Sequence, residues 1–211
     1  MKLENKTMLV YAVTDRTWLN GNTLEQQVEQ AIKGGATLIQ LREKELSYDA
    51  FLEQAIQLKR VTDKYQIPLI INDNVDIAKA VDADGVHVGQ KDMEAGAVRQ
   101  KLGENKIIGV SVQTVEQALL AQKQGADYLG VGAVFSTSTK LDASEVSFET
   151  LQKICHAVSI PVVAIGGISA QNILQLKNSG IDGVAVVSAI FAQKDITQAT
   201  KELTKLAKQI V

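Results

Sequence analysis

The sequence predicts an α/β protein, a (β/α)8 TIM barrel that forms a single domain over residues 1–211. Three observations predict it. Short apolar runs of strand length occur eight times and alternate with longer stretches of helical period. These runs do not alternate polar with apolar residues, as expected of parallel strands covered on both faces. The length leaves about 26 residues for each strand–helix unit, which is the unit size of a compact barrel. The rival fold, an open doubly wound sheet, usually has fewer strands and one dominant glycine fingerprint.

The eight expected strands are rich in Val, Ile, Leu and Ala. The first run is stopped by Asp15 and Arg16, and most of the others end at polar or glycine residues. In chain order the strands are expected at 8–13, 37–41, 68–71, 85–88, 107–110, 128–131, 162–165 and 183–187.

Helices are expected between these strands, most clearly at 23–33, 48–65, 114–124 and 170–178. In the first, Leu24, Val28 and Ala31 lie on one apolar stripe. Capping residues such as Ser47 precede several of them, and glycines such as Gly125 follow them just before a strand. Repeated connections of this kind predict parallel strands joined by right-handed crossovers.

Composition excludes several classes of protein. The hydrophobic fraction of 45% and the two prolines argue against disorder. Twenty-two basic and twenty-four acidic residues give a net charge of -2, so no nucleic-acid partner is expected. The single Cys155 excludes an intramolecular disulfide, and with two histidines any metal must be held by carboxylates. The apolar run at 8–13 is too short for a signal or a membrane span, so we expect a cytoplasmic protein with no membrane partner.

Polar residues cluster where the expected strands end, and in a barrel those ends share the rim on which active sites are built. Asp73 and Asp92 follow the third and fourth strands and suit Mg²⁺ held jointly with a phosphate. The alternative is that Asp73 caps the next helix and Asp92 forms a turn.

Three cations, Arg42, Lys44 and Lys140, also follow strand ends. If they face carboxylates that hold Mg²⁺, these cations predict a diphosphate clamp that neutralises charge on a leaving group. The alternative is that they are solvated surface charges. Gly167 after the seventh strand and Ser188 after the eighth lie where barrels commonly bind a phosphate. Two anion sites on one rim predict two phosphorylated substrates.

With these residues assembled, the chain resembles the thiamine-phosphate synthase family along nearly its whole length. Each motif alone would be unspecific, but their order and spacing together are specific. The matching segments are Tyr11-Ala12-Val13-Thr14-Asp15, Gln40-Leu41-Arg42-Glu43-Lys44, Ile71-Asn72-Asp73, Asp84-Gly85-Val86-His87-Val88-Gly89-Gln90, Gly109-Val110-Ser111, Gly125-Ala126-Asp127-Tyr128, Thr137-Ser138-Thr139-Lys140 and Ile165-Gly166-Gly167-Ile168.

The resemblance implies a (β/α)8 transferase that joins a hydroxymethylpyrimidine diphosphate to a thiazole phosphate, with Mg²⁺, and releases pyrophosphate by a dissociative route. Asp73 and Asp92 are then the implied metal ligands, and Arg42, Lys44 and Lys140 the implied catalytic residues. The implied contacts to the pyrimidine diphosphate are Gln40, Arg42, Lys44, Asn72, Ser111 and Lys140, and those to the thiazole phosphate are Thr137, Thr139, Gly167, Val187 and Ser188.

Two departures from the family pattern, Val112-Gln113 and Phe135-Ser136, concern the wall of the pocket and not the metal or diphosphate groups.

Two other functions stay open. A thiazole tautomerase of the same fold would need a histidine acid or base near Gln113, and a non-catalytic binder of thiamine phosphates would have no use for paired carboxylates facing cations. The sequence leaves the oligomeric state open, and a homodimer is compatible with it.

Overall fold

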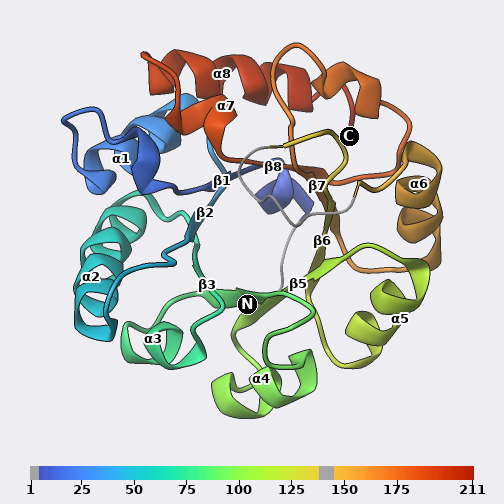
Figure 1. Cartoon of the computed structure of the whole chain (residues 1–211), viewed down its shortest axis with the longest axis horizontal. Helices are drawn as coiled ribbons and strands as arrows, with labels where there is room; N and C mark the ends of the chain where they lie inside the picture. Colours follow the sequence, from blue (N-terminus) through green and yellow to red (C-terminus); the bar gives the residue numbers. More distant parts are fainter. Residues whose placement is uncertain (1–4, 138–144) are drawn as a thin grey trace.

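The computed structural model describes residues 5–137 and 145–211 and contains a closed barrel of parallel strands (Figure 1). Each strand pairs with the next in sequence, and β8 pairs with β1 to close the ring. The predicted (β/α)8 fold is thereby confirmed. The strands are β1 (Val10–Val13), β2 (Leu38–Leu41), β3 (Leu69–Asn72), β4 (Gly85–Val88), β5 (Ile107–Val112), β6 (Tyr128–Gly132), β7 (Val162–Ile165) and β8 (Gly183–Val186).

Helices surround the barrel in Figure 1 and cover the outer faces of the strands. They are α1 (Leu24–Gly34), α2 (Tyr48–Tyr65), α3 (Val75–Ala80), α4 (Ala95–Leu102), α5 (Val115–Lys123), α6 (Phe148–Ala157), α7 (Ser188–Phe191) and α8 (Ile196–Ala207), with 3₁₀ turns η1 (Asn5–Met8), η2 (Arg16–Trp18) and η3 (Ile173–Leu176). In the described part of the chain, no helix has the length and apolar character needed to cross a membrane.

Side-chain caps start the long helices at the expected places. Thr23 accepts a hydrogen bond from the Gln26 N–H, and the Gln26 side chain accepts one from the Thr23 N–H, which makes a complete capping box on α1. Ser47 caps α2 and Ser147 caps α6 in the simpler one-way form.

The helix expected at 170–178 is wrong, because only the single turn η3 forms there. Asn172 explains the difference. Its side-chain oxygen accepts from the Ser169 N–H at 2.8 Å, and its amide nitrogen donates to the Gly167 carbonyl at 2.8 Å. These bonds fold the segment onto the turn after β7 and compete with helical hydrogen bonding.

Alternate strand residues point into the barrel and form a core separate from the one between strands and helices. Met8 closes the N-terminal end of this inner core, and Tyr11, Leu38 and Tyr128 fill its middle. At the C-terminal ends of β2 to β5 the inward positions change from apolar to polar. The residues there are Gln40, Asn72, His87 and Ser111.

Candidate active site

A cavity of about 440 Å³ opens at the C-terminal end of the barrel, and the strand ends line it. The structure brings to this one cavity every described residue that the sequence marked as a site residue. They are Gln40, Arg42, Lys44, Asn72, Asp73, Asp92, Ser111, Thr137, Gly167, Val187 and Ser188. The other two predicted site residues, Thr139 and Lys140, lie outside the described residues.

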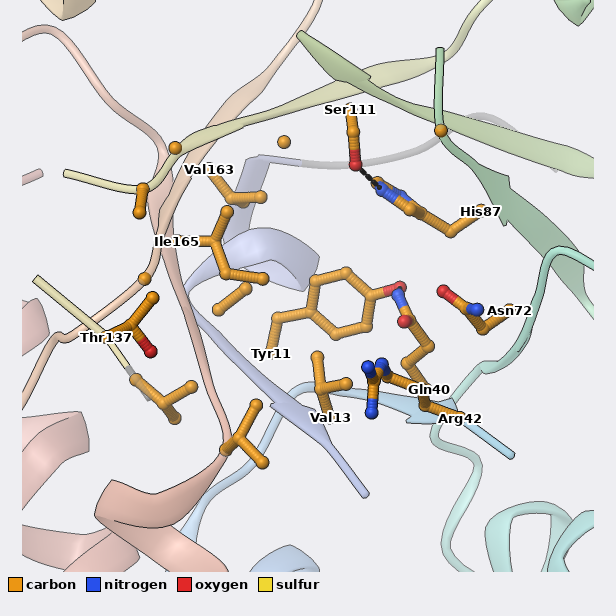
Figure 2. A pocket seen from close by; sticks show the side chains of 18 of the residues that line it. Tyr11, Val13, Gln40, Arg42, Asn72, His87, Ser111, Thr137, Val163 and Ile165 are labelled. Atoms are coloured by element: carbon orange, nitrogen blue, oxygen red, sulfur yellow. Dashed lines mark hydrogen bonds between the residues drawn. The ribbon is translucent and has the colours of Figure 1, made fainter. Parts of the chain in front are cut away.

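The cavity has a polar side and an apolar side (Figure 2). Gln40, Asn72 and Ser111 reach it from β2, β3 and β5, and the first two are at most 9% exposed. Val163 and Ile165 of β7 form the opposite wall. One end of the cavity therefore suits a charged, hydrogen-bonding group and the other a less polar ring.

Asp73 is held by cation and amide donors from two neighbouring strands. Its Oδ2 accepts from Lys44 Nζ at 2.5 Å and from Asn72 Nδ2 at 2.6 Å. Its φ of +60° places it in the left-handed region, which disfavours side chains other than Gly, Asn and Asp. Asn74, and not Asp73, caps α3. The capping alternative is therefore wrong for Asp73.

Asp92 does form a turn, since its Oδ2 accepts from the Gly89 N–H at 2.7 Å. It nevertheless lines the cavity together with Asp73. No group of three or more His, Cys, Asp or Glu side chains suited to a metal occurs within 5–137 and 145–211. Two carboxylates are a donor set that fits Mg²⁺, because Mg²⁺ in proteins commonly takes one or two carboxylates and completes its shell with phosphate oxygens and water.

Arg42 and Lys44 both line the cavity, whereas Glu43 between them is turned to the other side. Its carboxylate accepts from Arg16 Nε at 2.7 Å and its side chain is 4% exposed. Burial raises the pKa of Glu43, and the Arg16 guanidinium opposes that rise. This ion pair, with Glu43 buried and Arg16 partly exposed, joins the loop after β1 to the loop after β2 and so helps to fix the two cations on the cavity side.

The turn after β7 has the geometry of an anion cradle. Gly166 and Gly167 have φ values of +98° and +64°, and a Cβ on Gly167 would lie 2.4 Å from the Ser136 carbonyl oxygen. Only glycine fits at such a position. Val187 and Ser188 line the same side of the cavity.

Sequence reasoning missed a hydrogen-bonded chain at the floor of the cavity. Tyr11 and Tyr128 are both buried in the barrel interior, and their hydroxyl oxygens are 2.8 Å apart. His87 Nδ1 lies 2.9 Å from the Tyr128 hydroxyl, and its Nε2 lies 2.8 Å from Ser111 Oγ, the bond drawn in Figure 2. No sequence signal separates a tyrosine of this kind from an ordinary core residue.

In a comparison with known protein families, the model of thiamine monophosphate synthase matches residues 10–190. A thiamine-phosphate synthase of Ruminiclostridium cellulolyticum is 60% identical over 197 residues, which cover 93% of this chain and 94% of that protein. One of Clostridium tetani is 54% identical over 204 residues, covering 97% of this chain and 98% of the relative.

Among solved structures, a thiamine phosphate pyrophosphorylase from Pyrococcus furiosus superimposes with a TM-score of 0.90 at 40% identity, covering 98% of both chains. The relatives thus belong to the family that the sequence motifs indicate, and the solved structure has the barrel architecture described above.

Proposed function

Because the chain belongs to the thiamine monophosphate synthase family, we propose that its cavity binds two phosphorylated substrates side by side. The activity is a transfer, in which 4-amino-2-methyl-5-(diphosphooxymethyl)pyrimidine and a thiazole phosphate give thiamine monophosphate and pyrophosphate. We assign the diphosphate to the polar side of the cavity and the thiazole phosphate to the side formed by β6 to β8.

The observation that carries this assignment is the meeting of opposite charges in one cavity. Lys44 from the end of β2 contacts Asp73 from the end of β3, and Arg42 and Asp92 line the same space. A metal-bound diphosphate presents both a cation and anionic oxygens, so it needs carboxylates and cations together. A neutral substrate would give no reason for this arrangement.

The residues of the polar side then assist departure of pyrophosphate. The C–O bond breaks first, its electron pair leaves with the diphosphate, and the pyrimidine ring stabilises the cation that remains. Arg42 and Lys44, with Lys140 by its place in the sequence motif, hold the diphosphate oxygens and neutralise the charge that develops on them. The Ser111 hydroxyl donates a hydrogen bond to the same group. The route needs no strong protein base.

Asp73 and Asp92 would hold Mg²⁺ on this side of the cavity. When bound, Mg²⁺ would neutralise negative charge on the leaving diphosphate.

The opposite side of the cavity binds the second substrate in this proposal. Gly167 and Ser188, with Thr137 and Thr139, contact the thiazole phosphate, and Val187 packs on the ring. The thiazole nitrogen then attacks the pyrimidine cation with its lone pair. The apolar wall of Val163 and Ile165 reduces water at the reacting carbon, where water would otherwise capture the cation.

Release of pyrophosphate is the test. The purified protein, given both phosphorylated substrates and Mg²⁺, is expected to release one pyrophosphate for each thiamine monophosphate formed. Isomerisation of the thiazole without release of pyrophosphate would indicate the tautomerase. The position expected for the histidine of a tautomerase is occupied by Gln113, which argues against that activity. The Gln113 amide donates to the Gly132 carbonyl at 3.2 Å. Tight calorimetric binding without turnover would indicate a binding protein.

A further inference from the structure

The hydrogen-bonded chain at the floor of the cavity connects two residues of the proposed diphosphate site. Gln40 Nε2 donates to the Tyr11 hydroxyl at 2.6 Å, and three further contacts, of 2.8, 2.9 and 2.8 Å, run through Tyr128 and His87 to Ser111. We call these five residues the relay. Its middle members come from β1, β4 and β6, so the relay crosses the interior of the barrel.

Each hydroxyl and the imidazole can give only one hydrogen, and this fixes the direction of the relay. Tyr11 already accepts from Gln40, so its own hydrogen must go to Tyr128. If Tyr128 donated to Tyr11 instead, the Tyr11 hydrogen would be left without the acceptor it has in the relay, in a side chain only 1% exposed. An unsatisfied buried donor costs about 1–3 kcal/mol.

The same reasoning continues to the cavity. The Tyr128 hydrogen goes to His87 Nδ1, so the neutral imidazole carries its hydrogen on Nε2 and donates to Ser111 Oγ. The hydroxyl hydrogen of Ser111 then remains for an acceptor in the cavity. If the hydrogen bonds of the relay ran in the opposite direction, the Ser111 hydroxyl would donate its hydrogen to His87 and would present only lone pairs to an anion.

We propose that Tyr11, Tyr128 and His87 are positioning residues that keep the Ser111 hydroxyl as a hydrogen-bond donor to the departing diphosphate. This inference rests on the proposed function, which places the diphosphate at Ser111. Burial raises the pKa of both tyrosines, so both phenols keep the hydrogens that the relay needs.

The barrel interior is shaped around the relay. A Cβ on Gly109 would lie 2.1 Å from the Tyr128 ring, and a Cβ on Gly130 would lie 3.1 Å from His87 Cε1. The Tyr11 and Tyr128 rings meet edge to face with centroids 5.8 Å apart. Two inward glycines thus make room for aromatic side chains whose hydroxyl and imidazole groups continue the relay.

The tautomer of His87 tests the direction without any substrate. The chain has two histidines, so ¹⁵N NMR of the imidazoles, with His156→Gln to assign the signals, resolves His87 at a pH of about 8, where neutral imidazole is the ordinary form. We expect an Nε2–H tautomer with Nδ1 as the acceptor. An Nδ1–H tautomer, or a doubly protonated ring, would overturn the proposal.

A double-mutant cycle tests whether the relay acts through Ser111. Tyr128→Phe is expected to lower kcat about tenfold. It is expected to change the KM for the pyrimidine diphosphate and the KM for the thiazole phosphate by less than about twofold. Ser111→Ala is expected to lower kcat about a hundredfold. In the Ser111→Ala protein, Tyr128→Phe should then change kcat less than about twofold, because the hydroxyl it orients is gone.

Tyr65→Phe is the matched control. It also removes one hydrogen-bonded tyrosine hydroxyl, the one that donates to Glu29, but Tyr65 ends α2 on the outside of the barrel. Its kcat should equal that of the wild type. Additive losses in the cycle would mean that Tyr128 serves only packing and would overturn the inference. The proposed function would survive that result, and it fails separately if the unaltered protein releases no pyrophosphate.

Discussion

Lys44 is paired with a carboxylate of the cavity, and this pairing bears on the role that we propose for it. Its ammonium contacts the Asp73 oxygen at 2.5 Å, although both groups are assigned to the same metal-bound diphosphate. The Lys44 and Asp73 side chains are 51% and 29% exposed, so water screens their attraction and the pair is easily exchanged. We therefore expect Lys44 to serve the reaction far more than the stability of the fold.

Lys44→Met is expected to lower turnover about a hundredfold, since it removes one fixed positive charge from the leaving group. The free energy of unfolding should change by less than about 1 kcal/mol. Steady-state kinetics and urea unfolding measure the two effects. Lys153→Met is the control, because Lys153 pairs with Glu149 on the exposed surface of α6 and should leave turnover unchanged. Turnover of Lys44→Met within about twofold of wild type would contradict its role.

Cys155 is a second residue whose behaviour follows from its surroundings. Burial, reinforced by the nearby Asp182 carboxylate, raises the pKa of the thiol to about 12. Because the thiolate is the reactive form, alkylation by iodoacetamide at a pH of about 8 should be roughly a thousandfold slower than for an ordinary thiol. The same protein in denaturant should react at the ordinary rate. Rapid modification of the folded protein would show that the thiol is ionised.

Single residues also show where sequence reasoning stops. Asp73 and Asp92 were recognised because polar residues that end parallel strands share one rim. That Lys44 and Asp73 share the rim was predictable, whereas their direct contact, between residues 29 positions apart, depends on how the two side chains are placed at neighbouring strand ends. Tyr11 and Tyr128 carried no polar signal at all, because a buried tyrosine contributes to a core whether or not its hydroxyl has a task.

At the scale of elements, the strands were predictable because each is covered on both faces and reads as a short continuous apolar run. The ends of the observed strands agree with the expected ones to within two residues, and the main differences are that Met8 belongs to η1 and that β5 continues to Val112. The segment at 170–178 failed because its period was helical while the Asn172 side chain bound the preceding turn.

Packing between neighbouring strands gives a prediction of its own. Gly109 on β5 lies against the Tyr128 ring of β6, and an added Cβ would meet Tyr128 Cζ at 2.1 Å. Gly109→Ala should therefore destabilise the fold by about 1–3 kcal/mol, as overpacking of a core does. It should also lower kcat, because Tyr128 must shift out of the relay. The urea midpoint at constant m-value measures the first effect.

Gly96→Ala is the matched control for that change. Gly96 lies within α4, and a Cβ there would meet nothing nearer than the Gln124 carbonyl oxygen at 3.9 Å. Alanine in a helix should stabilise the fold by about 0.5–1 kcal/mol. Equal stability of Gly109→Ala and wild type would show that the barrel interior adapts to the extra methyl group.

At the scale of the whole molecule, closure of the barrel makes one site from distant parts of the chain. Arg42 and Lys44 follow β2, whereas Gly167 follows β7, and all three line one cavity only because β8 pairs with β1. Opening the barrel would separate the two substrate sides. Ligand binding and global folding should consequently be linked, since a ligand that binds only the closed barrel stabilises all of it.

Pyrophosphate tests this linkage, because it is the product expected on the polar side. With Mg²⁺, at about a hundred times its Kd, it should stabilise the fold by about 2.7 kcal/mol. For a chain of this length that raises Tm by roughly 5 to 10 °C in a calorimetric scan.

Chelating Mg²⁺ with EDTA, or replacing Asp73 by Asn, should remove the magnesium-dependent part of the shift. The reason is that Asp73 is one of the two carboxylates to which we assign the ion, so Asp73→Asn removes a charged ligand. Asp63→Asn, which removes an exposed carboxylate paired with Lys59 on α2, should keep the full shift. A full magnesium-dependent shift in Asp73→Asn would mean that the ion is held elsewhere on the rim.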